Sequence, residues 1–348
     1  MTDLVPAPDP LRITHPDRVY WPAREHYPAI TKRELLEYFA AVSAYVLPHL
    51  RDRPLTLRRF PTGTSGKRFY QKHVEFPLPS FVDRALVFAE EHAASGYHVI
   101  CNNVETLLWL AQIGNLELHP WYSRINPEPD ARRLPTIFSG SVETLEASVL
   151  NYPDFMVFDL DPYLYSGAER GGEEPELHRE GFARACTAAR WLKTLLDELD
   201  LRSFVKTSGK SGLHVLVPIL REFDHDTVRR ISAHICRYVL EHHPESVTME
   251  WSVDRRRGKV FLDHKQNTRG KTLASPYSPR ALPGAPVSMP VAWAELDDVY
   301  PTDFRIATVG ARLADVGDIW SDLLECKNDL GAMDLTSADA ARGRETAG

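Results

Sequence analysis

The chain has 348 residues, of which 43% are hydrophobic and 26% charged, and its formal net charge is −7. This composition is that of a globular protein with a core, and it excludes disordered, collagen-like and disulfide-scaffold chains. No apolar run approaches 18 residues and the start lacks a signal pattern, so we expect a cytoplasmic protein without a membrane partner. The four cysteines form no CxxC pair, which argues against a zinc site and predicts buried free thiols.

Basic residues gather in two stretches of this net-negative chain. Residues 51–72 hold seven cations against one acid, Asp52, and residues 255–280 hold eight against one, Asp263. Such segregation allows local positive fields that attract nucleic acid. The alternative is two solvated basic faces.

The first 152 residues predict helices and short strands. A capping box at Thr31–Glu34 predicts a helix that ends at Pro48. The other expected elements are hairpin strands over 54–60 and 67–73, strands over 86–89 and 97–101, a helix over 104–113 and a strand over 116–121. Residues 123–152 are expected to be mostly loop.

The second half predicts strands with longer helices between them. The expected strands cover 155–162, 202–207, 213–220, 259–263 and 271–274. The expected helices cover 177–199, 224–243, 293–296 and 318–324. Strands and helices do not alternate one for one, and hairpins occur. We therefore predict the α+β class with mixed or antiparallel sheets flanked by helices.

The stretch Phe155–Pro162 runs from apolar residues into two carboxylates, Asp159 and Asp161. In a strand these side chains point to one face with Cα atoms about 7 Å apart, and they repel each other. Mg²⁺ or Mn²⁺ removes that repulsion because a hard cation prefers oxygen ligands. Pro162 cannot donate to a ladder, so we expect the strand to stop there. The alternative is a strand-end turn with two solvated carboxylates.

A glycine loop between two predicted strands, Ser208–Gly212, is the second candidate. Gly209 and Gly212 permit a backbone in which successive N–H groups converge on an anion. It is not a P-loop, because Phe204 stands where the first glycine belongs and a strand follows the loop. The alternative is an ordinary glycine turn.

Asp263 ends another apolar strand, as Asp159 and Asp161 end the first. If the two strands are neighbours, three carboxylates meet, and three carboxylates can hold two divalent ions for phosphoryl transfer. The basic residues around this strand suit a polyphosphate. Taken alone, Asp263 would be a surface residue.

Three motifs carry a resemblance to a known family. They are Asp159-Leu-Asp-Pro162, Ser208-Gly-x-x-Gly-Leu-His214, and Asp263-x-x-Gln-Asn267 continued by Lys271-Thr272 and Pro276-Tyr-Ser-x-Arg280. They look like the motifs of the polymerase domain of bacterial DNA ligase D, in the archaeo-eukaryotic primase-polymerase superfamily. The resemblance covers roughly residues 11–325 and implies the primase-polymerase fold, with sheets forming a central cleft. No Lys-x-Asp-Gly ligase motif is present, so we expect a stand-alone member.

The resemblance implies roles for particular side chains. Asp159, Asp161 and Asp263 would be catalytic and hold two Mn²⁺ or Mg²⁺ ions. The nucleotide-site residues would be Arg58, His119, Ser208, Ser211, His214, Arg256, Gln266, Lys271 and Arg280. The DNA contacts would be Arg18, Lys32, Phe69, Tyr70 and Lys72. The aromatic pair among them would stack on bases, and Arg18 and Lys32 would grip a 5′-phosphate.

Three departures from the family pattern stand out. Tyr70 stands where the family usually has phenylalanine, and Ser211 where it often has lysine. Residues 123–151 are longer than we expect and form either a loop that reshapes the DNA groove or a surface insertion.

The resemblance implies a DNA-directed nucleotidyltransferase (EC 2.7.7) that adds ribonucleotides or deoxyribonucleotides to DNA primer ends and fills short gaps in repair. Expected partners are gapped or broken DNA with a 5′-phosphate, nucleoside triphosphates, and a DNA ligase or end-binding protein. The alternatives are a metal-dependent nucleotide-sugar transferase, which would show no salt-sensitive DNA binding, and a non-catalytic DNA-end scaffold.

The expected organisation is a single catalytic domain over residues 1–330. Its lobes would be an N-terminal part over 1–122 and a catalytic part over 152–330, with a disordered tail over 331–348. We expect a monomer associated with the nucleoid.

Overall fold

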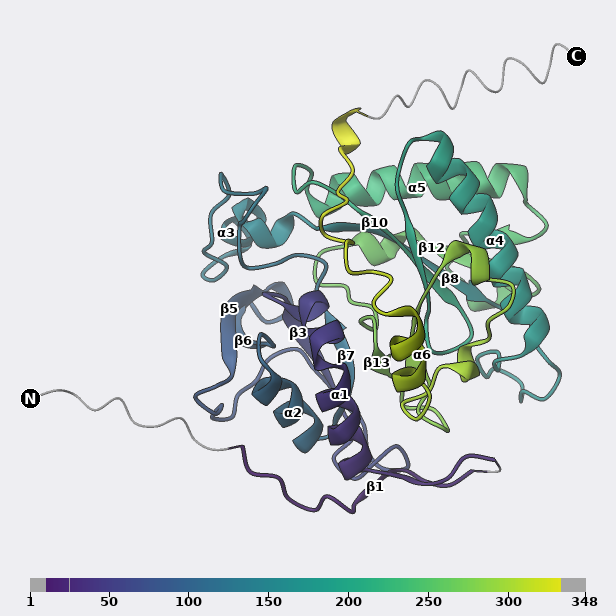
Figure 1. Ribbon diagram of the computed structural model, residues 1–348. Helices are drawn as coiled ribbons and strands as arrows, with labels where there is room; N and C mark the ends of the chain where they lie inside the picture. The colour runs from purple at the N-terminus through teal and green to yellow at the C-terminus, as the bar shows by residue number, and fades with distance from the viewer. Residues whose placement is uncertain (1–10, 25, 333–348) are drawn as a thin grey trace, which may run out of the picture. The chain divides into compact units, whose positions relative to one another are not determined.

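The computed structural model describes residues 11–24 and 26–332 (Figure 1). The chain forms two compact units. Of the described residues, the first contains those from 11 to 151 together with 270–289 and 301–318, and the second contains 152–269, 290–300 and 319–332. The chain thus returns twice to the first unit, so each unit is built from segments that are not continuous in the sequence.

The helices of the first unit begin with α1, Lys32–Leu50. The predicted capping box is present, because the Thr31 side chain accepts from the Glu34 amide and the Glu34 carboxylate accepts from the Thr31 amide. Pro48 lies inside the last turn, so the helix end predicted there was wrong by two residues. A proline that close to the end removes little of the hydrogen-bond ladder. Helix α2, Val104–Gln112, packs against α1, and α3, Val142–Ala147, lies in the region expected to be loop.

An antiparallel sheet forms the centre of the first unit. Its strands are β3 (Pro54–Arg59), β4 (Phe69–Gln71), β5 (Asp83–Ala89), β6 (Ala94–Ile100) and β7 (Asn115–Pro120). The order is β4-β3-β6-β5, and β7 also pairs with β3. The predicted hairpin is confirmed by the pairing of β3 with β4. Two small sheets pair β1 (Val19–Trp21) with β2 (Ile30–Thr31), and β13 (Ser278–Pro279) with β14 (Val287–Ser288).

Two expectations for the C-terminal part were wrong. The strand expected over 271–274 is absent, and Thr272 forms only an isolated bridge with Trp121. The helix lies earlier than expected, as α6 over Val309–Val316, and residues 318–324 form turns. Gly317 follows α6 with φ +67°, a conformation that ends a helix.

The second unit is built on a six-stranded sheet in the order β11-β12-β8-β10-β9-β15. The strands are β8 (Phe155–Pro162), β9 (Phe204–Thr207), β10 (Leu213–Pro218), β11 (Val247–Thr248), β12 (Val260–Asp263) and β15 (Pro290–Val291). Only the β11–β12 pair is parallel. The predicted α+β class with mixed and antiparallel sheets is therefore confirmed. The central β8 brings the first carboxylate motif between two neighbouring strands.

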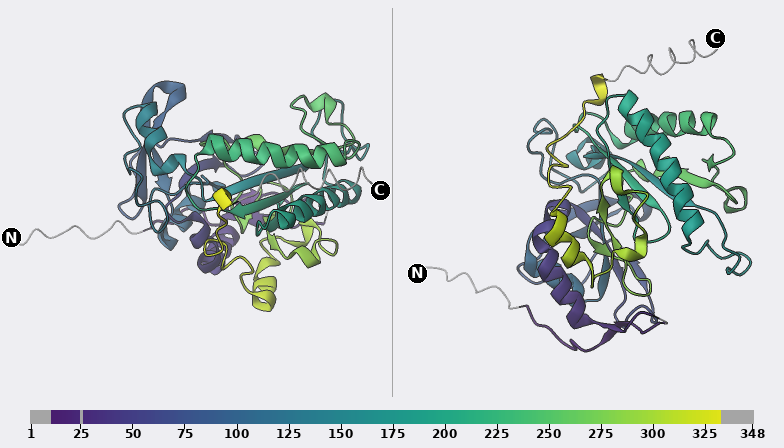
Figure 2. Two further views of the ribbon diagram at one scale, coloured as in Figure 1. Left: turned by 90° about the horizontal axis from the view of Figure 1, so that it is seen from above. Right: turned by 45° about the vertical axis from the view of Figure 1, so that its right-hand side comes forward.

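Two long helices, α4 (Arg179–Glu198) and α5 (His225–His242), pack against β8 and against each other. Figure 2 shows them beside this sheet in teal and green. Asp224 caps α5 by accepting from the Thr227 amide at 2.8 Å. Short 3₁₀ helices cover Glu90–His92, Val149–Asn151, Val253–Arg255, His264–Asn267, Trp293–Glu295, Pro301–Asp303 and Leu330–Ala332.

Three further expectations concern cysteines, membranes and the tail. Cys101, Cys186 and Cys236 are buried free thiols, as predicted, whereas Cys326 is only partly buried. Within the described residues, every helix is too short or too polar to cross a membrane. The expected disordered tail lies, from residue 333 onward, outside the described residues.

Candidate active site

The three predicted carboxylates lie on adjacent strands of the second unit. Strand β12 pairs antiparallel with β8, which puts Asp263 directly opposite Asp159 and Phe261 opposite Asp161. Side chains directly opposite each other share a face of the sheet, and so do residues two apart along a strand. All three carboxylates therefore belong to one face. The condition set by the sequence, that the two strands be neighbours, is met.

Asp159 is 6% exposed and has polar neighbours on two sides. The Gln266 amide donates to Asp159 Oδ2 at 3.3 Å, and His214 Nε2 lies 3.4 Å from Asp159 Oδ1. His214 is on β10, directly opposite Asp159. The structure thus brings two of the predicted nucleotide-site residues, His214 and Gln266, against a predicted catalytic carboxylate.

Behind His214 lies a charged residue that the sequence analysis did not select. Lys206 on β9 is 1% exposed, and its Nζ is 2.6 Å from His214 Nδ1. An ammonium group can only donate, so His214 Nδ1 accepts, and the ring proton is on Nε2, which faces Asp159. Lys206 therefore fixes the tautomer of His214. The signal in the sequence was a lysine that directly follows the apolar pair Phe204-Val205 within a predicted strand.

The chemistry of the three carboxylates fits Mn²⁺ or Mg²⁺. Like charges directly across a strand pair destabilise it, and oxygen ligands suit hard cations, which would remove the repulsion. Among the described residues, however, no three Asp, Glu, His or Cys side chains are arranged to hold a metal ion. Ion binding would therefore require the carboxylates to turn toward one another.

The glycine loop lies directly against the carboxylate strand. A Cβ at Gly212 would lie 2.2 Å from Leu160 O and 3.1 Å from Asp161 Oδ1, so no side chain fits there. Ser208 Oγ accepts from the amides of Lys210 and Gly212 at 3.1 and 3.2 Å. Two of the amides expected to converge on an anion thus converge on this serine instead. The loop is preorganised by Ser208, and the half-exposed Ser211 lies within it.

Asn267, which the motif contains but to which no role was assigned, joins the two carboxylate strands. Its side chain accepts from Val157 N and donates to Val157 O, both at 2.8 Å, two residues before Asp159. It also donates to Ser232 Oγ on α5 at 3.0 Å. Because Asn267 follows Asp263 by four residues, these bonds hold the end of β12 against β8.

Arg256, predicted to bind the nucleotide, is 6% exposed and holds a loop together. Its guanidinium donates to the carbonyls of Glu250 and Trp251 at 2.9 and 2.7 Å, and to the Tyr163 hydroxyl at 2.7 Å. The carbon of the guanidinium is also 3.6 Å from the centroid of the Phe261 ring. These contacts give Arg256 a structural role in the second unit.

The first unit contains a separate charged cluster around Glu117 of β7, a fully buried carboxylate. Arg58 Nη1 donates to Glu117 Oε2 at 2.6 Å and His119 Nε2 lies 2.9 Å from the same oxygen. Arg280 Nε is 3.3 Å from that oxygen. Three predicted nucleotide-site residues are thus gathered by one carboxylate that the sequence analysis missed. The acid between Leu116 and Leu118 was its only signal.

Electrostatics keep Glu117 ionised. Burial alone would raise the pKa of its carboxyl group, but Arg280, His119 and Arg58 outweigh burial and hold this pKa well below the ordinary value. Burial lowers the pKa of His119, against the opposing effect of Glu117, so the imidazole is neutral and donates from Nε2. Two buried guanidinium groups then face one carboxylate.

The other predicted residues of the first unit lie outside this cluster. Phe69 and Tyr70 on β4 are 45% and 64% exposed, so neither is a core residue, and the Arg58 guanidinium lies 5.3 Å from the Tyr70 ring centroid. Lys72 is exposed and pairs with Glu91. Lys271 is exposed.

The two residues expected to grip a phosphate differ in environment. Arg18 is exposed and donates to Pro61 O at 2.8 Å. Lys32 is 2% exposed, and its ammonium group donates to Thr14 O at 2.8 Å and to the carbonyl and side-chain oxygens of Gln112, both at 3.2 Å. Burial and the charge of Arg18 lower the pKa of Lys32. Arg18 and Lys32 therefore repel each other electrostatically.

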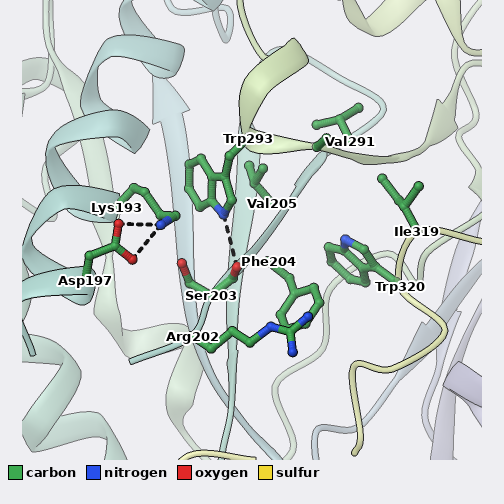
Figure 3. Close-up of a pocket in the computed structure, with 11 residues that line it drawn as sticks. Lys193, Asp197, Arg202, Ser203, Phe204, Val205, Val291, Trp293, Ile319 and Trp320 are labelled. Atoms are coloured by element: carbon green, nitrogen blue, oxygen red, sulfur yellow. Dashed lines mark hydrogen bonds and ion pairs between the residues drawn. The ribbon is translucent and has the colours of Figure 1, made fainter. Parts of the chain in front are cut away.

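A cavity of about 350 Å³ lies at the β9–β15 edge of the second unit's sheet (Figure 3). Phe204, Trp293 and Trp320 line it, and the Trp293 indole donates to Ser203 O at 3.0 Å. None of the predicted site residues lines this cavity. It is not the candidate active site.

Comparison with known proteins decides the family. The family model described as LigD, primase-polymerase domain, matches residues 31–320. The chain belongs to this family. Its solved structural neighbours include the polymerase domain from Mycobacterium tuberculosis Ligase D in complex with DNA, with a TM-score of 0.75 and 27% sequence identity, covering 92% of this chain and 99% of that one.

Curated LigD relatives extend the comparison. The multifunctional non-homologous end joining protein LigD of Pseudomonas aeruginosa is 31% identical over 92% of this chain and 34% of that protein. The LigD protein of Mycolicibacterium smegmatis is 29% identical over 90% of this chain and 36% of that protein. The chain thus spans about a third of the length of these relatives. Membership of the LigD family removes support for the nucleotide-sugar transferase alternative.

Proposed function

We propose that the chain is a DNA repair primase-polymerase of non-homologous end joining, a nucleotidyltransferase that adds nucleotides to DNA primer ends and fills short gaps. One observation carries the proposal: in a member of the LigD primase-polymerase family, Asp263 lies directly opposite Asp159 with Asp161 on the same face. The preferred nucleotide would be a ribonucleotide.

Asp159, Asp161 and Asp263 would hold the divalent ions. When bound, such ions lower the pKa of the attacking hydroxyl and neutralise charge on the triphosphate and the leaving group. The side chains around the carboxylates have positioning roles. His214, held by Lys206, keeps a proton directed at Asp159, and Asn267 keeps the two carboxylate strands in register.

The Glu117 cluster would bind the negatively charged part of the nucleotide. The support is that Arg58, His119 and Arg280 all contact Glu117, and that guanidinium groups pair well with phosphate oxygens. Arg18 is exposed and its charge lowers the pKa of the buried Lys32, and we propose that it contacts a 5′-phosphate of gapped DNA.

The test is extension of a primer in a gapped DNA duplex with Mn²⁺, comparing ribo- and deoxyribonucleoside triphosphates. The wild type is expected to add nucleotides and to prefer ribonucleotides. Asp159→Ala and Asp263→Ala should each abolish incorporation yet keep DNA binding. Full activity in either variant contradicts the metal-ligand roles, and DNA binding without incorporation by the wild type supports the non-catalytic scaffold.

A further inference from the structure

An exposed tryptophan stands beside the carboxylate strands of the second unit. Trp251 is 58% exposed, although it is among the largest apolar side chains in the chain. Its ring centroid lies 6.4 Å from that of Phe261, at an interplanar angle of 69°. Phe261 is directly opposite Asp161 and two residues before Asp263. Trp251 therefore packs on the residue that adjoins the carboxylates on the same face.

The loop that carries Trp251 is held in place rather than loosely attached. Arg256 donates to Trp251 O and Glu250 O, and its guanidinium lies over the rings of Phe261 and Tyr163, at 3.6 and 4.8 Å. The buried arginine thus fixes the backbone at residues 250–251. The chain thus holds a large exposed ring at a defined place beside the carboxylate strands.

The surroundings of Trp251 are positively charged. Between residues 250 and 265 there are five cations and three acids, and Arg255 Nη1 lies 3.5 Å from Glu250 Oε2. Lys265 Nζ lies 4.6 Å from the Trp251 ring centroid, and Arg255 and Arg257 are exposed on the same loop. An aromatic ring among lysine and arginine side chains matches a ligand that has a flat π-face and phosphates. An apolar protein surface would not match these charges.

We propose that Trp251 is a stacking site for an unpaired base of DNA next to the catalytic carboxylates, with Arg255, Arg257 and Lys265 facing the adjoining phosphates. This inference rests on the proposed function, since it requires that the chain bind a DNA end. Stacking on a side chain reads no sequence, because every base has a π-face. A sequence-independent contact suits an enzyme that accepts any broken end.

The test measures binding of the full chain to a DNA hairpin with a 3′ single-stranded overhang, by fluorescence anisotropy, with one abasic site moved through the overhang. Trp251→Ala should weaken binding of the intact overhang by about 5- to 100-fold. Trp251→Phe should stay within about twofold, because it keeps a ring. Ile137→Ala is the matched control, since Ile137 is a 63% exposed apolar residue of the first unit, and it should leave affinity unchanged.

The abasic series identifies the stacked base. In the wild type, an abasic site at one position should weaken binding as much as Trp251→Ala weakens binding of the intact overhang. With the abasic site at that position, Trp251→Ala should cause no further loss of affinity. The proposal is overturned if Trp251→Ala binds like the wild type, or if Trp251→Phe binds as weakly as Trp251→Ala. It is also overturned if the affinity lost through the abasic site and the affinity lost through Trp251→Ala add at every position of the overhang. A wild type that binds the hairpin but adds no nucleotides contradicts the proposed activity and leaves this stacking test intact. A wild type that binds no DNA overturns both.

Discussion

At the scale of single residues, Asp159 and Asp263 place two carboxylates directly opposite each other on one strand pair. Like charges directly opposite each other destabilise a sheet, and a bound cation removes that cost. The proposed metal-ligand roles therefore predict that the protein is less stable when no cation is present.

Asp263→Asn should therefore raise the melting temperature in EDTA by about 1–3 °C, because it removes one charge of the pair. Mn²⁺ should raise the melting temperature of the wild type and have little effect on the variant. Differential scanning calorimetry with and without Mn²⁺ measures both. Asp254→Asn, the same change at an exposed site, is the control. An equal Mn²⁺ effect in both variants would remove Asp263 from the ligand set.

Glu117→Gln should lower the free energy of unfolding at pH 7 by about 3 kcal/mol, because two buried guanidinium groups lose their counter-charge. The pKa of Glu117 is lowered in the folded state, so the unfolded chain protonates first as pH falls. The stability from this group is complete above the ordinary carboxyl pKa and is lost below it. The free energy of unfolding, measured with urea from pH 7 to pH 4, should thus decrease less steeply in the variant than in the wild type. Glu37→Gln, at an exposed glutamate of α1, is the control and should leave the slope unchanged.

Arg18 and Lys32 should respond differently to substitution. Arg18→Ala should erase any preference for gaps with a 5′-phosphate over a 5′-hydroxyl and leave the melting temperature unchanged. Lys32→Met should lower the melting temperature, because Thr14 O and Gln112 O lose a buried donor. Binding to the two gap types, together with thermal unfolding, separates these effects. An unchanged 5′-phosphate preference in Arg18→Ala refutes its role.

At the scale of elements, the short 3₁₀ helix His264–Asn267 connects three parts of the second unit. Asn267 bonds the backbone of β8 and Ser232 of α5, and His225 Nδ1 lies 2.9 Å from Asn267 O. The position of Asp263 at the end of β12 thus depends on a side chain four residues later. Register alone would leave the strand end free to fray.

Asn267→Ala should lower the free energy of unfolding by about 2–4 kcal/mol, since it leaves the buried amide and carbonyl of Val157 without a partner. Primer extension should slow as well, because Asp263 is no longer held opposite Asp159. Chemical denaturation and extension rates measure the two effects. The control is Asn126→Ala, at an exposed asparagine of the first unit. Wild-type stability in Asn267→Ala would contradict the role of this helix.

At the scale of the whole molecule, the net charge is −7, although residues 51–72 and 255–280 are each strongly basic. DNA binding should weaken steeply with salt, because phosphate contacts release counterions. A plot of the logarithm of the binding constant against the logarithm of the salt concentration has a negative slope. Arg257→Gln should reduce the magnitude of this slope by about 1, as expected for the loss of one phosphate contact. Arg132→Gln, at an exposed ion pair with Glu128, should leave the slope unchanged. A salt-independent affinity would contradict binding through the DNA backbone.

The sequence determined most of the elements and placed three carboxylates at the ends of two strands that the structure pairs. The apolar run that leads into Asp159, the capping box before α1 and the glycine turn between β9 and β10 are local signals, and short-range sterics and hydrogen bonds decide them. The motif residues were recognisable for the same reason, because each motif is a contiguous run. The strand wrongly expected over 271–274 and the helix wrongly expected over 318–324 fall where short segments are decided by distant contacts.

Only the tertiary structure decided which residues support the site. Lys206, Glu117 and Asn267 are single polar residues among apolar ones or within a motif, and nothing in their local sequence says which partner each meets. Strand order sets those partners: β8 between β10 and β12, and β7 beside β3. Strand order depends on contacts between residues tens to a hundred positions apart, where burial free energy and the hydrogen-bonding needs of buried polar groups act on the whole chain at once.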